Sequence, residues 1–183
     1  TINMESLFEF FVRAALKEYL RKDSDSHIVL DEYRMSQKNP LFTLKDSDQQ
    51  AYLMNHYVPD IALIDQSDSE SKYIAVFDVK YQNSMNAVYG ETRRHNSHQL
   101  LFYTLLLNVK RCGFIFPKQR KDEKLGDLEM YELNIQSGDA MDFSNREYTQ
   151  WSAEFTSTSN NQLAERIMHY VKGINSAVKP DTN

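Results

Sequence analysis

The amino-acid sequence predicts an α/β protein in which a mixed central sheet is flanked by helices. Residues 4–20 and 161–174 repeat apolar side chains at the spacing of amphipathic helices, and runs of strand composition lie between them. A strongly helical segment, residues 99–109, separates the earlier strands from a later one. Strands that follow one another directly meander, whereas a helical crossover leads to a further strand in the same sheet. The predicted core order is therefore helix, strand, strand, strand, helix, strand, or α-β-β-β-α-β.

The individual elements follow from local patterns. In the first helix the apolar residues are Met4, Leu7, Phe8, Phe11, Val12, Ala15, Leu16 and Tyr19. Strand character is found in residues 27–35, 58–65 (VPDIALID) and 73–81 (YIAVFDVKY), with a polar, turn-like segment between the last two. A short strand around Gly113 ends at Pro117, and residues 127–135 alternate like an edge strand. Residues 82–96 are expected to form a loop that runs into the helix at 99–109.

Length and composition predict one domain, residues 1–175, followed by a frayed tail at 176–183. The chain has 183 residues, of which 41% are hydrophobic and 12% aromatic, as in a packed globular protein. No apolar run approaches the ~18 residues that cross a bilayer. Glu5 and Glu9 within the first amphipathic pattern are unlike a signal peptide. The single Cys112 cannot form an internal disulfide, and it is expected to be a small core residue. We expect a cytoplasmic protein without a membrane partner.

The net charge of −5 is unfavourable for autonomous nucleic-acid binding, because contacts to phosphate need cations. It is compatible with a module that another subunit delivers to DNA.

Two carboxylates and a lysine interrupt the apolar faces of two adjacent predicted strands. Alternation of side chains places Asp78 and Lys80 on the face of Val76, and Asp60 on the face of Ala62. A charge on a buried face is costly unless it is paired or bound to metal. One such residue is explained by an ion pair, but two in neighbouring strands favour a functional site. Two carboxylates that converge with a lysine can bind a divalent cation that activates water against a phosphodiester.

These residues also carry a resemblance to a known superfamily. Pro59-Asp60 resembles the Pro-Asp of the PD-(D/E)XK nucleases, and Asp78-Val79-Lys80 resembles their D/E-x-K motif. Gln99 and Tyr103 share a helix face and are similar to the Q-x-x-x-Y signature of RecB-type members. The order of predicted elements is similar as well, over about the first two-thirds of the chain. The resemblance implies a restriction-endonuclease-like core.

A closer likeness is to McrC, the nuclease subunit of McrBC-type modification-dependent restriction systems. Its first helix carries Phe-Glu followed by an aromatic residue and Val, here residues 8–12 (FEFFV). Its D-x-K-aromatic pattern appears at residues 78–81 (DVKY), and its crossover helix leads to a strand that ends in aromatic-Pro, here Phe116-Pro117. A McrC protein would carry a further N-terminal region that joins its motor partner, so this chain would be either the nuclease part of such a subunit or a different small relative.

Each residue of the expected site has a separate role in metal binding or catalysis. Asp60 and Asp78 would hold Mg²⁺, or Mn²⁺ in its place, with the backbone carbonyl of Val79 as a further ligand. Lys80 would orient the attacking water or neutralise charge on the phosphate. Glu9, and with it Glu5, either reaches the site from the first helix or is an exposed helix charge that pairs with Arg13 or Lys17.

Further polar residues could contact water or DNA, or they could be ordinary structural or solvent-exposed residues. Gln99 and Tyr103 either position water or the DNA backbone, or they form an ordinary polar edge of a buried helix. Arg93 and Arg94 are the better candidates for phosphate contacts. His95 and His98 either contact phosphate or are solvated residues at the helix start, and we expect the second. The cluster Lys118, Arg120, Lys121 and Lys124 is interleaved with acidic residues and is expected to be a solvated loop.

The leading hypothesis is a Mg²⁺-dependent deoxyribonuclease, an endonuclease domain of a restriction or defence system. Its partners would be double-stranded DNA and an AAA+/P-loop NTPase subunit like McrB. Two alternatives stay open, a RecB-like exonuclease domain and a non-catalytic assembly or binding subunit with the same fold. The sequence does not define the recognition site, the need for modified bases or the oligomeric state.

Overall fold

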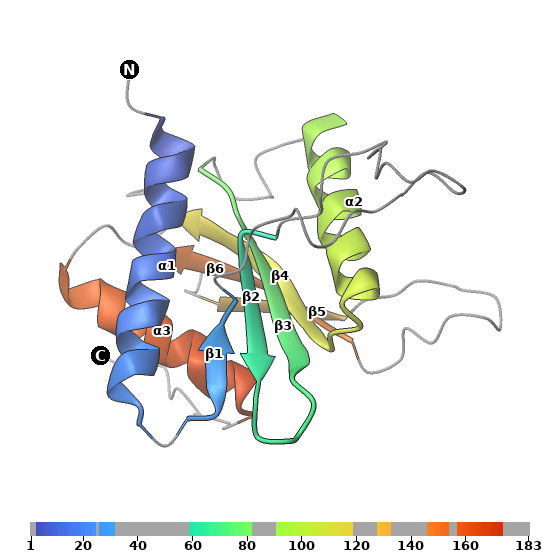
Figure 1. The fold of residues 1–183 in the computed structure, drawn as a ribbon. Helices are drawn as coiled ribbons and strands as arrows, with labels where there is room; N and C mark the ends of the chain where they lie inside the picture. Colours follow the sequence, from blue (N-terminus) through green and yellow to red (C-terminus); the bar gives the residue numbers. More distant parts are fainter. Residues whose placement is uncertain are drawn as a thin grey trace, which may run out of the picture.

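Three helices and a six-stranded sheet make up the described part of the chain (Figure 1). The computed structural model describes residues 3–24, 26–31, 59–81, 91–118, 128–132, 146–153 and 157–173. The elements in chain order are α1 (Met4–Lys22), β1 (Ile28–Leu30), β2 (Ile61–Asp65), β3 (Lys72–Val79), α2 (Glu91–Leu106), β4 (Arg111–Pro117), β5 (Leu128–Glu132), β6 (Glu147–Ala153) and α3 (Ser157–Val171). The predicted tail at 176–183 and the basic residues Arg120, Lys121 and Lys124 lie outside the described residues.

The sheet is mixed, which confirms the predicted α/β fold class. Its strand order is β1-β2-β3-β4-β6-β5. The first three strands form an antiparallel meander, and α2 then crosses over to β4, which lies parallel to β3. β6 is parallel to β4, and β5 pairs antiparallel with β6 as an edge strand. The restriction-endonuclease-like order α-β-β-β-α-β is therefore present, with β5, β6 and α3 added to it.

Helix α1 begins at a side-chain cap. Asn3 Oδ1 accepts hydrogen bonds from the backbone N–H groups of Glu5 at 3.0 Å and Ser6 at 3.4 Å, which satisfies donors that the first turn leaves without a helical partner. The buried face of α1 then follows the predicted repeat through Phe8, Val12, Ala15 and Leu16. This helix has the predicted start, and it extends two residues past the predicted end.

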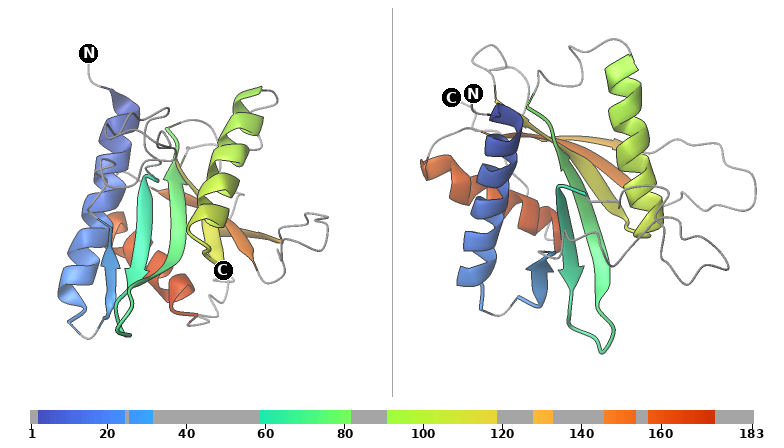
Figure 2. Two further views of the ribbon diagram at one scale, coloured as in Figure 1. Left: turned by 45° about the vertical axis from the view of Figure 1, so that its right-hand side comes forward. Right: turned by 45° about the horizontal axis from the view of Figure 1, so that its top comes forward.

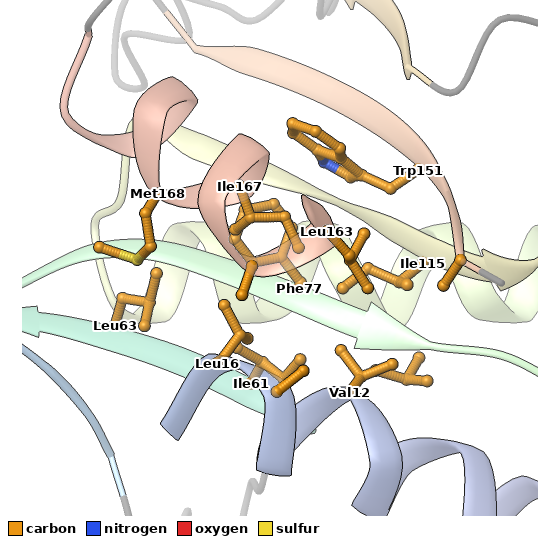
Figure 3. Packing of buried hydrophobic residues seen from close by; sticks show 14 of the residues in the cluster. Val12, Leu16, Ile61, Leu63, Phe77, Ile115, Trp151, Leu163, Ile167 and Met168 are labelled. Atoms are coloured by element: carbon orange, nitrogen blue, oxygen red, sulfur yellow. The ribbon is translucent and has the colours of Figure 1, made fainter. Parts of the chain in front are cut away.

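The larger part of the core lies between one face of the sheet and the helices α1 and α3 (Figure 3). Phe77 from β3 and Ile115 from β4 meet Leu16 of α1 and Ile167 of α3 there, and all four side chains are fully buried. The opposite face of the sheet is covered by α2, whose Leu100 and Tyr103 pack with Val76, Cys112, Phe114 and Phe116. Cys112 is thus the buried core residue that its apolar context predicts.

Two segments differ from the sequence-based expectations. α2 begins at Glu91 rather than near residue 99, because its first turns are polar and the apolar repeat that marks a helix starts only at Leu100. β6 was not predicted. Its buried face includes Thr149 and Ala153 beside Trp151, so its alternation of apolar and polar residues is weak. Within the described residues, no helix is both long and apolar enough to span a membrane.

One end of the molecule gathers three chain segments that are far apart in sequence. The C-terminal end of β3 and the N-terminal ends of α1 and α2 all lie at the top of Figure 1, and the views in Figure 2 agree. The end of β3 therefore lies at the same end of the molecule as the first turns of α1 and α2. The candidate site lies here.

Candidate active site

The pairing of β2 with β3 brings the two predicted carboxylates together. Ile61 pairs with Phe77 and Ala62 with Val76, so the same register continues to Asp60 opposite Asp78. The backbone N–H of Val79 donates to Oδ2 of Asp60 at 2.7 Å, which fixes the Asp60 carboxylate against the end of β3. The two strand ends thus hold a pair of acidic side chains on the face of the sheet that α2 covers.

Asp78 is buried to 1% exposure among apolar side chains. Its Oδ2 lies 2.9 Å from Lys80 Nζ in an ion pair. Its Oδ1 is also buried, and no hydrogen-bond donor from the described residues reaches it. Burying a carboxylate oxygen without a donor is costly, and either a proton on Asp78 or a cation beside it would lower that cost.

The environment of Asp78 disfavours its negative charge. Burial, followed by repulsion from Asp60, raises the pKa of Asp78 to about 7, and the attraction of Lys80 only partly opposes this shift. In the absence of a cation, Asp78 therefore holds its proton to a much higher pH than an exposed aspartate does. A bound divalent cation would favour the ionised pair and release a proton.

Lys80 follows β3 directly and points back to the same face. Its backbone N–H donates to the carbonyl of Ile115 at 3.0 Å, which extends the pairing with β4 by one residue, and its side chain is 15% exposed. Burial alone would lower the pKa of Lys80, but the attraction of Asp78, Asp60 and Glu5 outweighs it and raises the pKa. The lysine is accordingly a fixed positive charge.

Asp60 differs from the prediction in its burial. It was expected on a buried strand face, but it precedes β2 and is only partly buried. Its backbone carbonyl accepts a hydrogen bond from Nη1 of Arg13 at 2.5 Å, and Nη2 of the same guanidinium donates to the carbonyl of Asp31 at 3.2 Å. Sequence analysis did not assign Arg13 to the site. The signal was the polar stripe along α1, in which Arg13 follows Glu9 at a spacing of four.

That stripe directs Glu9 toward the start of β2. Glu9 lies one helical turn before Arg13 on the same side of α1, and its Oε1 is buried. Glu5 is exposed, and its charge contributes to the raised pKa of Lys80. Glu9 is therefore partly buried rather than fully exposed on α1.

From the other layer, α2 contributes the pair Gln99 and Tyr103. Gln99 Nε2 donates to the Tyr103 hydroxyl at 3.1 Å, and Tyr103 packs in the cluster that contains Val76, on the face that also bears Asp78. Gln99 lies one turn nearer than Tyr103 to the N-terminal end of α2, the end of this helix that lies at the top of Figure 1 with the C-terminal end of β3. The helix thus places a hydrogen-bonded polar pair over the face of the carboxylates.

The start of α2 carries two arginines and two histidines, and the structure describes the side chains of the histidines only. Arg93 and Arg94 belong to its first turn, but the described residues do not include their side chains. His95 and His98 are exposed, as expected for solvated residues near the helix start.

The oxygen atoms at the end of β3 could serve as ligands of a divalent cation. In the ranges that the structure describes, no three His, Cys, Asp or Glu side chains are grouped to hold a metal ion. The candidate donors are two carboxylates and the Val79 carbonyl, all of them oxygen. Mg²⁺ prefers such donors, and it keeps several waters when one or two carboxylates hold it. The buried Oδ1 of Asp78 supports this fit.

The chain matches a known protein family over the part that contains these residues. A family model described as McrBC 5-methylcytosine restriction system component matches residues 1–117 of the 183. The chain belongs to this McrBC family. The matched region runs from α1 to the end of β4, so it contains every candidate site residue named above. The predicted likeness to a restriction-system component is therefore confirmed. No curated protein matches the chain.

Proposed function

We propose that this McrBC-family chain is a Mg²⁺-dependent DNA endonuclease domain of PD-(D/E)XK type, the nuclease part of a McrC-like subunit. The observation that carries the proposal is the pairing of Asp60 and Asp78 at the end of β3, with Lys80 2.9 Å from the buried Asp78. The family match supports a role in a restriction system.

Each residue of the pair has a defined task. Asp60, held through its side chain by Val79 N–H, and Asp78, held among apolar neighbours, would bind the cation through their carboxylate oxygens. When bound, Mg²⁺ would supply a Lewis acid that lowers the pKa of water and neutralises charge on the phosphodiester. Lys80 would contribute a preorganised positive charge toward the same phosphate.

The flanking helices would complete the site. Glu9 extends the carboxylate pair from α1, either as a ligand or by a hydrogen bond to a water ligand. Gln99 and Tyr103 would orient water or a DNA phosphate through the polar pair that they form on α2. Arg93 and Arg94, at the start of that helix, would contact the DNA backbone.

A partner would supply much of the DNA affinity. The net charge of −5 gives the chain little electrostatic attraction for DNA. A McrB-like AAA+/P-loop NTPase in the same system would bring DNA to the nuclease site, and it would couple cleavage to NTP hydrolysis.

The proposal is tested by nicking of supercoiled plasmid DNA at low salt with Mg²⁺ or Mn²⁺. The parent should nick the plasmid only with the cation, and Asp78→Asn should abolish nicking while the protein stays folded. Asp68→Asn is the matched control, because Asp68 lies exposed in the turn between β2 and β3. Cleavage in EDTA, or native cleavage by Asp78→Asn, would overturn the proposed site.

A RecB-like exonuclease is the second candidate, and the hydrogen bond between Gln99 and Tyr103 is the observation that favours it. The same assay separates the two, because an endonuclease cuts a covalently closed circle whereas an exonuclease degrades only linear DNA. A parent protein that cuts neither substrate and binds no Mn²⁺ would be a non-catalytic assembly subunit.

A further inference from the structure

Arg13 connects three elements that meet at the candidate site. It lies in the middle of α1, and its side chain is partly buried. Its Nη1 donates to the carbonyl of Asp60, which precedes β2, at 2.5 Å. Its Nη2 donates to the carbonyl of Asp31, which follows β1, at 3.2 Å. One guanidinium therefore joins the first helix to the end of one strand and the start of the next.

The two acceptors belong to one stretch of the sheet edge. Leu30 pairs with Leu63, and the N–H of Asp31 donates to the carbonyl of Ala62 at 2.9 Å, so pairing of β1 with β2 continues up to Asp31. Asp60 lies just beyond this ladder. A planar fork of donors suits two carbonyls at fixed separation better than a single ammonium group does.

Asp60 is thereby held from two directions. Its side chain is held by the N–H of Val79 in β3, and its backbone is held by Arg13 of α1. A carboxylate that serves as a metal ligand must keep its orientation within a few tenths of an ångström, and residues behind the ligands supply this rigidity. Of the described residues, Pro59 and Asp60 precede β2 and are not part of its strand.

We propose that Arg13 is a positioning residue, which fixes the backbone of Asp60 so that its carboxylate points at the cation and toward Asp78. It touches neither the cation nor DNA, and its role rests on the proposed function of the site. The guanidinium acts through the Asp60 main chain, so both its charge and its forked geometry matter.

The experiment measures Mn²⁺ binding by the full chain through loss of the electron paramagnetic resonance signal of free Mn²⁺. Arg13→Gln should bind Mn²⁺ about 10–100-fold more weakly than the parent, the usual effect of removing such a supporting group. Arg13→Lys should fall between them, because lysine can donate to one carbonyl but not to both in the fork geometry. Arg21→Gln, an exposed position on the same helix, is the matched control and should equal the parent.

A second measurement separates positioning from a purely structural role. Plasmid nicking by Arg13→Gln should recover toward the parental rate as Mn²⁺ is raised, and the variant should already be folded before the cation is added. Urea unfolding in EDTA reports the fold independently.

The outcomes distinguish the two proposals. If the parent binds Mn²⁺ and Arg13→Gln or Arg13→Lys binds it equally well, the role of Arg13 is wrong and the proposed function stands. If both Arg13 variants are unfolded, Arg13 belongs to the fold and the positioning proposal fails. If the parent binds no Mn²⁺, the proposed function fails, and the role of Arg13 fails with it.

Discussion

At the scale of single residues, Asp78 should make stability depend on pH in the metal-free protein. Its pKa is raised from 3.8 to about 7 in the fold, so the folded state holds a proton that the unfolded state has lost between these pH values. The contribution of this site to stability is therefore full below about pH 4, and it falls as the pH rises to about 7, by at most about 1.4 kcal/mol per pH unit.

Urea unfolding in EDTA across this pH range measures that effect. Asp78→Asn should flatten the decline, because the amide carries no charge to bury, whereas the exposed control Asp68→Asn should keep it. Saturating Mg²⁺ should also reduce the decline, since a cation stabilises the ionised pair. Parallel curves for the parent and Asp78→Asn would contradict the assigned environment of the carboxylate.

Lys80 should act on the rate of cleavage more than on DNA affinity. It is a preorganised charge beside the carboxylates, and loss of one such interaction costs roughly 10²–10³ in rate. Lys80→Ala should therefore bind duplex DNA about as tightly as the parent and nick it far more slowly. Lys72→Ala, an exposed position at the other end of β3, provides the matched control. A defect confined to binding would assign Lys80 to DNA contact instead.

At the scale of elements, the junction of β4 with β6 should tolerate no side chain at Gly113. A Cβ there would lie 2.3 Å from the carbonyl oxygen of Thr149 and 2.4 Å from its hydroxyl. That hydroxyl accepts a hydrogen bond from the Trp151 indole at 2.9 Å, so it is fixed within the core. Gly113→Ala should lower the free energy of unfolding by about 1–3 kcal/mol through overpacking.

Urea unfolding of Gly113→Ala measures this cost, with Ser69→Ala in the exposed turn before β3 as the control. A change below about 0.5 kcal/mol, the usual range of surface substitutions, would show that β4 and β6 approach less closely than described.

Sequence analysis predicted the elements whose hydrophobic residues repeat with one clear helical or strand period. The apolar repeat of α1 predicted the helix. In β3, Asp78 interrupts an apolar face that is buried, and this interruption predicted the candidate carboxylate pair. β6 was missed because Thr149 and Ala153 occupy buried positions that composition does not mark. The start of α2 was missed because its first turns are polar and lack the apolar repeat that marks a helix.

The polar stripe on α1 marked Arg13, but its contacts could not be predicted from the sequence because they are to main-chain carbonyls. A hydrogen bond to the backbone of Asp60 or Asp31 leaves no trace in the identity of the acceptor residue. The partial exposure of Asp60 also depends on where β2 begins, and strand boundaries are the least predictable part of a pattern.

At the scale of the whole molecule, the chain alone should be a weak binder of DNA at physiological salt. Its net charge is −5, so it is expected to neutralise few DNA phosphates. The logarithm of the binding constant falls with the logarithm of the salt concentration, with a slope of roughly −0.9 for each neutralised phosphate. Weak binding at low salt therefore becomes weaker still at physiological salt. Fluorescence anisotropy with a labelled duplex in EDTA, repeated as KCl is raised, measures this dependence. Tight, sequence-specific binding that survives physiological salt would contradict dependence on a partner and favour a self-sufficient restriction enzyme.

The central claim is that Asp60 and Asp78 together form a divalent-cation site, and Mn²⁺ binding to the double variant Asp60→Asn/Asp78→Asn tests it most directly. The parent should bind Mn²⁺ and be stabilised against urea by it, in proportion to the occupancy of the site. The double variant should fold, because it removes charge from a crowded and partly apolar environment, yet it should show neither binding nor stabilisation. A folded double variant that binds Mn²⁺ as tightly as the parent would contradict the account.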